Sequence, residues 1–163
     1  MTTTHPAIEQ AKASFLQSKE ALKGAFANTP DARVNWSPAA TARTPAQQVA
    51  HAAEAIGHIQ SQLAGTPLAW LTTEDMDRHF RQNELRITSR EQALDLLEQN
   101  SAAYVAWLDS LAPDDLSRLA QMPFGLGHCP VSIGLTFAPD HMRWHTAQIE
   151  YMQTIYGDRD WHL

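Results

Sequence analysis

Cysteine is almost absent from this chain: Cys129 is the only one among 163 residues. A single cysteine excludes an intrachain disulfide and fits a reducing cytoplasm. Long apolar runs are absent as well, since no stretch approaches the roughly 18 residues that a membrane span needs. The opening segment MTTTHPAIEQ has no basic region followed by an apolar run, so it does not predict a secretory signal. We therefore expect a cytoplasmic protein with no membrane-spanning segment.

Positive charge is also scarce. The sequence has 12 Lys and Arg against 18 Asp and Glu, which gives a formal net charge of −6. Proteins that bind nucleic acid usually present a basic face, and no cluster of Lys and Arg occurs here. We expect no nucleic-acid partner. Because domains commonly hold roughly 100–200 residues, residues 1–163 are expected to form one domain with a substantial core.

Four segments carry the apolar spacing of helices, and polar connections that contain proline or glycine separate them. The second segment opens on a capping box, TPAQ at 44–47, and a similar box, TSRE at 88–91, opens the third. The expected helices cover about residues 6–27, 45–64, 88–112 and 136–156. The long connection after the second helix is expected to hold a short helical turn. With no alternating strand pattern, the sequence predicts an all-α four-helix bundle.

Two histidines lie four residues apart in the last predicted helix, within DHMRWHTAQIEYM. At about 100° per residue, His141 and His145 project from the same apolar face of that helix. Burying polar rings without partners costs a few kcal/mol each, so both rings need partners. They are either structural histidines that hydrogen-bond to their neighbours or chelators of one metal ion, because side chains at i and i+4 meet on one face.

The second predicted helix carries a polar face that includes His51, Glu54, His58 and Gln62. Steps of three, four and seven residues return to nearly the same direction on a helix, so these side chains lie together. The pattern is typical of a solvated helix face. It is equally consistent with a cleft that opens onto a metal ion, with His51 as a candidate third ligand.

The order of these elements resembles the DinB/YfiT-like superfamily. The matching pieces are TPAQQVAHAAEAIGHI and, about ninety residues later, HMRWHTAQIEYM, in which a glutamine follows the second histidine by three positions. The resemblance implies a four-helix bundle with up-down-down-up connectivity and a long crossover between the second and third helices. It implies a divalent metal, zinc or nickel, held by His51, His141 and His145. The sequence departs from the pattern at Pro139, which leaves open where the last helix begins.

Three protein ligands leave an open coordination position, which is typical of catalytic rather than structural zinc sites. Glu54, His58 and Gln148 are candidates to support the metal or transfer protons, although polar surface or structural contacts would explain them equally. His79 lies in the long connection and needs no function.

The resemblance implies a metal-dependent enzyme that acts on a small molecule, either a thiol S-transferase using a low-molecular-weight thiol or a hydrolase. The alternative is a non-catalytic, stress-related bundle that binds metal or ligand. The resemblance also implies a homodimer. Leu68, Trp70 and Leu71 form an apolar group in the crossover that either contributes to such an interface or folds back onto its own bundle.

Overall fold

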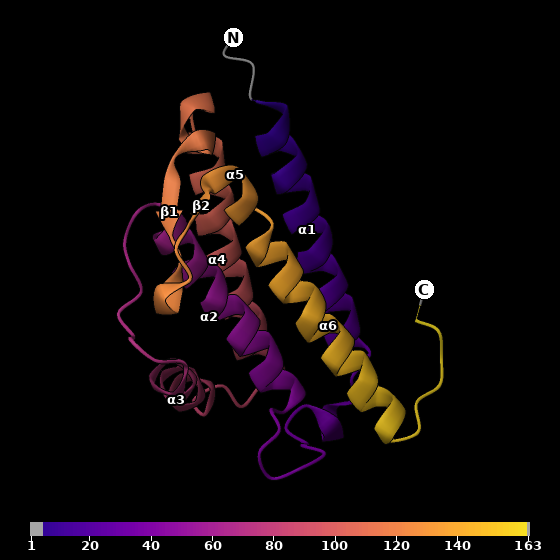
Figure 1. Cartoon of the computed structure of the whole chain (residues 1–163). Helices are drawn as coiled ribbons and strands as arrows, with labels where there is room; N and C mark the ends of the chain where they lie inside the picture. Colours follow the sequence, from indigo (N-terminus) through magenta and orange to yellow (C-terminus); the bar gives the residue numbers. More distant parts are fainter. Residues whose placement is uncertain (1–4, 163) are drawn as a thin grey trace.

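Four long helices form a bundle in the computed structural model, which describes residues 5–162 (Figure 1). Residues 1–4, which begin the segment inspected for a secretory signal, and residue 163 lie outside the described part. The bundle helices are α1 (Pro6–Ala27), α2 (Pro45–Leu63), α4 (Arg90–Ser110) and α6 (Phe137–Ile155). The prediction of an all-α four-helix bundle is confirmed.

Contacts between the helices establish their directions. α1 and α6 run the same way, and α2 and α4 run the opposite way (Figure 1). The side-chain contacts that establish these directions are Lys12–Asp109, Lys19–Glu98, Arg143–Ser14, Gln153–Ala25 and His145–Gln48. α2 and α6 are antiparallel, and the hydrogen bond between Gln48 and His145 places the start of α2 against the middle of α6.

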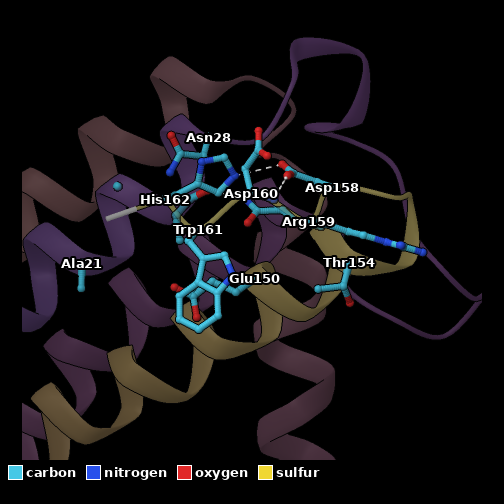
Figure 2. A pocket seen from close by; sticks show the side chains of 12 residues that line it. Ala21, Asn28, Glu150, Thr154, Asp158, Arg159, Asp160, Trp161 and His162 are labelled. Atoms are coloured by element: carbon cyan, nitrogen blue, oxygen red, sulfur yellow. Dashed lines mark hydrogen bonds and ion pairs between the residues drawn. The ribbon is translucent and has the colours of Figure 1, made fainter.

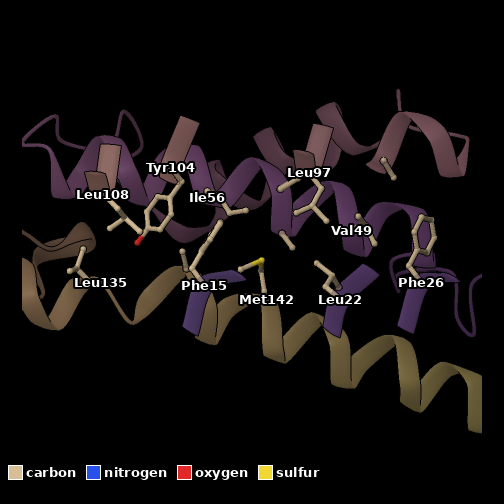
Figure 3. Packing of buried hydrophobic residues seen from close by; sticks show 14 of the residues in the cluster. Phe15, Leu22, Phe26, Val49, Ile56, Leu97, Tyr104, Leu108, Leu135 and Met142 are labelled. Carbon is tan, nitrogen blue, oxygen red and sulfur yellow. The ribbon is translucent and has the colours of Figure 1, made fainter. Parts of the chain in front are cut away.

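The core lies where the apolar stripes of the four helices meet (Figure 3). Phe15 of α1 and Tyr104 of α4 pack with their ring centroids 4.5 Å apart, and both side chains are fully buried. Met142 of α6 fills the space beside them and is also fully buried. Every bundle helix supplies buried apolar side chains to this core.

The ends of the helices follow their capping residues. Thr44 and Gln47 form the predicted capping box at the start of α2. The box of α4 uses Ser89 and Gln92, one residue later than predicted, because the Gln92 side chain accepts the backbone N–H of Ser89. The last helix begins at Phe137, close to the predicted start. Its proline therefore lies in the first turn, where a missing N–H breaks no helical hydrogen bond.

The crossover between α2 and α4 contains a full helix, α3 (Thr73–Glu84), where the sequence predicted only a short turn. The helix has hardly any apolar stripe, and Phe80 is its one buried apolar side chain. Apolar periodicity therefore could not reveal it. α3 is instead started by Thr72, whose side chain accepts the N–H of Asp75.

Short elements complete the chain between α4 and α6. Strands β1 (Leu119–Gln121) and β2 (His128–Pro130) form an antiparallel pair in which Ala120 is opposite Cys129. The same region holds η2 (Pro113–Ser117), η3 (Pro123–Gly125) and α5 (Val131–Gly134), and one further short helix, η1 (Asp31–Arg33), lies between α1 and α2. Across residues 5–162, no helix is both long and apolar enough to cross a membrane.

Candidate metal centre

The three histidines predicted as ligands come together between α2 and α6. Nitrogen atoms of His51, His141 and His145 lie within 4.8 Å of one another. The two Nε2 atoms of the α6 pair are 3.2 Å apart, and the His51 ring centroid lies 4.9 Å from that of His145. Antiparallel packing of α2 against α6 brings residues ninety positions apart in sequence to one point.

Hydrogen bonds at the other ring nitrogens orient two of these imidazoles. His145 Nδ1 lies 2.6 Å from Gln48 Oε1, and His51 Nδ1 lies 2.7 Å from Glu84 Oε1. An amide or carboxylate oxygen accepts here, so each Nδ1 carries the proton and each Nε2 keeps its lone pair. This assignment follows from the partners rather than from observed hydrogens. Histidines that bind metals commonly donate their second N–H to such an oxygen.

Glu84, the last residue of α3, is a buried carboxylate with only 2% of its surface exposed. Its Oε2 atom accepts from Arg43 Nε at 2.8 Å, and Arg43 also contacts Asp77 at 3.1 Å. The arginine balances the buried negative charge. Sequence reasoning missed Glu84 because α3 was not predicted, and it missed Gln48 because a glutamine three residues before His51 carries no distinctive signal.

The environment keeps the α6 histidines neutral. Burial, with smaller contributions from His51 and Arg43, lowers the pKa of His141 to about 4. Burial and then the neighbouring His141 lower the pKa of His145 to about 2. Neutral imidazole is the form that binds metal ions. The site is therefore in the ligand form at neutral pH without first having to release protons from these two rings.

The donor set fits a transition-metal ion. Two ligands at 2.0–2.1 Å from a tetrahedral ion lie about 3.4 Å apart, close to the 3.2 Å between His141 and His145 Nε2. When both nitrogens are unprotonated their lone pairs face each other, and a cation between them relieves that repulsion. Nitrogen ligands favour zinc, nickel or copper over magnesium or calcium.

The other predicted site residues lie outside this group of three. Glu54 and His58 belong to a separate cluster with His79. Gln148 is exposed, and its amide only slightly favours a protonated His145, whose orientation comes from the hydrogen bond to Gln48.

A pocket of about 300 Å³ lies beside Gln48, the hydrogen-bond partner of His145, although none of the three histidines lines it. Its lining includes Gln48, which contacts His145, and Arg43, which contacts Glu84. Arg81 and Gln148 also line it. Apolar side chains, among them Met152, complete its wall. This volume is at the lower end of what small-molecule sites occupy.

A larger cavity, of about 560 Å³, lies between α1, α6 and the C-terminal tail (Figure 2). Trp161 and His162 of the tail form one wall, and His162 contacts Asp158 at 3.0 Å. None of the three clustered histidines lines this cavity. Its size alone does not make it the functional site.

The fold and this histidine cluster define a helical bundle with a candidate metal site. The family model of the DinB superfamily matches residues 14–149. The chain therefore belongs to the DinB superfamily, and the resemblance inferred from the sequence is confirmed.

Solved structures support the same fold at low sequence identity. One is YfiT from Bacillus subtilis, which is described as a probable metal-dependent hydrolase with an unusual four-helix bundle topology. It is 16% identical to this chain with a TM-score of 0.71, and the match covers 96% of this chain and 92% of that chain. A protein from Streptococcus pneumoniae is 16% identical with a TM-score of 0.74, over 95% and 94%. The mycothiol-dependent maleylpyruvate isomerase is 14% identical with a TM-score of 0.72, over 91% of this chain but only 63% of that chain. No curated protein sequence matches significantly.

Proposed function

We propose that the protein is a metal-dependent enzyme that acts on a small molecule, with zinc or nickel held by His51, His141 and His145. The observation that carries the proposal is the orientation of two of these rings. Gln48 and Glu84 accept from Nδ1 of His145 and His51, which leaves Nε2 of each ring as the available ligand atom, and ring nitrogens of all three histidines lie within 4.8 Å of one another.

A site with three protein ligands keeps a coordination position for water or substrate. A divalent ion bound there supplies Lewis-acid chemistry, polarising a carbonyl and lowering the pKa of a coordinated water or thiol. The protein's own contribution is to keep His141 and His145 neutral and to orient the rings of His51 and His145. The pocket beside Gln48 is small and open to solvent, and it presents the amides of Gln48 and Gln148 and the guanidinium groups of Arg43 and Arg81.

Two reaction types suit this arrangement: transfer of a low-molecular-weight thiol to an electrophile, and hydrolysis. The first is the style suggested by the mycothiol-dependent isomerase, and the second by YfiT, which is described as a metal-dependent hydrolase. Both proteins share the fold at identities that transfer no substrate. We also propose a cytoplasmic homodimer. The unpaired Cys129 supports the compartment, and Leu71, 88% exposed in the crossover, supports the interface.

The test combines metal content with two activity screens. Protein purified without a histidine tag is analysed for bound metals, then assayed for thiol consumption with a panel of small electrophiles and for hydrolysis of activated esters and amides. We expect about one ion at the triad and an activity that disappears in His145→Ala. A metal-free protein, or an activity unchanged in that variant, would refute the proposal.

A non-catalytic metal- or ligand-binding bundle is the second candidate. One observation favours it: His145 is only 6% exposed, so this ligand is largely shielded from a substrate in solution. Metal bound at the triad without activity in either screen would support this second candidate.

A further inference from the structure

A second group of ligand-type side chains lies beside the candidate metal centre. Glu54 and His58 of α2 and His79 of α3 place one oxygen and two nitrogens within 4.8 Å of one another. Glu54 Oε1 is 3.1 Å from His79 Nε2 and 3.7 Å from His58 Nε2. Both distances are close to the separation of about 3.4 Å expected for two ligands of one tetrahedral zinc ion.

The hydrogen bonds in this cluster conflict when no cation is present. Asn83 Nδ2 lies 2.6 Å from Glu54 Oε1 and 3.0 Å from His79 Nε2. If His79 Nε2 carries a proton and donates it to Glu54, it cannot accept from Asn83, and two N–H donors then lie 3.0 Å apart. If it accepts from Asn83, its lone pair faces the carboxylate. A cation uses the lone pairs of Glu54 and His79 together, and Asn83 then donates to the carboxylate without competition.

Aromatic packing fixes the two imidazoles. The Trp70 ring centroid is 4.7 Å from that of His58 and 4.7 Å from that of His79. Trp70 therefore covers both rings, which confirms that this part of the crossover folds back onto its own bundle. The Glu54 side chain is only 18% exposed.

We propose that Glu54, His58 and His79 bind a second divalent transition-metal ion, with zinc as the best match. Two histidines and one glutamate form a ligand set that zinc uses in proteins. The expectation that His79 needs no function is thereby replaced, since α3 brings it against the polar face of α2.

The second ion is separate from the first. His51 and His58 are seven residues apart on α2, which corresponds to about 10.5 Å along a helix. Metal ions that act on one substrate together lie about 3.5–4 Å apart. The Phe80 ring also packs against both histidines, with centroid distances of 4.4 Å and 5.4 Å. We therefore assign the second ion a bracing role. It links α3 to α2, and α3 carries the Glu84 carboxylate that orients His51.

The experiment measures zinc bound per chain. Tag-free apoprotein is dialysed against a limited excess of Zn²⁺ and analysed for metal, for the wild type, His79→Ala, His145→Ala and the double variant. We expect about two ions in the wild type, one in each single variant and none in the double variant, because each site needs all three of its ligands. His128→Ala removes an exposed histidine outside both clusters and should retain both ions.

The outcomes separate the two sites. Equal zinc in wild type and His79→Ala would overturn this proposal, whereas equal zinc in wild type and His145→Ala would overturn the triad. If His79→Ala loses helicity, Glu54→Gln provides the same test with a side chain of the same shape. Amide hydrogen exchange gives a second readout. Exchange across residues 64–84 should slow when the second equivalent of zinc is added to the wild type, and should not slow in His79→Ala.

Discussion

Substitution of Glu84 by glutamine tests how the structure prepares the triad. The carboxylate accepts from His51 at one oxygen and from Arg43 at the other, at 2.7 Å and 2.8 Å. Glutamine has nearly the same shape but only one acceptor. If its oxygen faces His51, its NH₂ group faces the N–H of Arg43, so two donors meet and neither has an acceptor. If its NH₂ group faces His51, the imidazole proton must move to Nε2, the atom that would bind the metal.

Either orientation weakens the site. Loss of a partner that orients a metal ligand typically lowers metal affinity by 10–100-fold, which corresponds to about 1.4–2.8 kcal/mol at 1.4 kcal/mol per decade. We expect Glu84→Gln to weaken zinc binding at the triad by this factor. The free energy of unfolding should fall by about 1.5–3 kcal/mol, the range for hydrogen bonds to charged groups.

The assay is competition for Zn²⁺ with a chromophoric chelator. It is carried out in a His79→Ala background, so that the proposed second site does not contribute. Asp77→Asn is the matched control, because Asp77 also contacts Arg43 but is 50% exposed and does not touch His51. It should leave zinc affinity unchanged and cost less than about 1 kcal/mol of stability. If Glu84→Gln binds zinc as tightly as its parent, Glu84 does not orient a metal ligand.

Three further outcomes are expected. His145→Ala should lose the triad's metal and keep its far-UV circular dichroism, and full metal retention would show that the ligand set is wrong. In the apoprotein, the free energy of unfolding should be highest above pH 6.5 and fall toward pH 4. The unfolded chain protonates His141 near its ordinary pKa of about 6.5, whereas the folded chain does so only near 4. The loss from this residue is up to about 3 kcal/mol, and His141→Gln should reduce the pH dependence measured by urea unfolding. Light scattering should report about twice 18.1 kDa, and a monomer at micromolar concentration would contradict the proposed dimer.

The bundle could be predicted because its signals are local. The stripe that contains Leu97, Tyr104 and Leu108 repeats at helical spacing, and Thr44 with Gln47 marks a helix start. The pair His141 and His145 could be predicted for the same reason, since four residues along one helix fix their relation.

The partners of the triad could not be predicted in this way. Glu84 reaches His51 only because α3 folds back onto α2, and α3 has too few apolar side chains to be recognised as a packed helix. The contact of His79 with Glu54, at 3.1 Å, depends on the same folding back of α3. Contacts that depend on a crossover between helices leave no spacing rule in the sequence.

The weak apolar character of α3 has a consequence for how metal and fold are coupled. Within α3 only Phe80 and Glu84 are buried, so few contacts hold the helix against the bundle. Regions with few buried contacts open at low free-energy cost. A ligand that binds only the docked form stabilises it by about 2.7 kcal/mol when present at 100 times its Kd. An ion held by Glu54, His58 and His79 requires α3 to be docked, and docking of α3 is also what brings Glu84 to His51. Filling the second site should therefore strengthen metal binding at the first, although the two sites share no ligand.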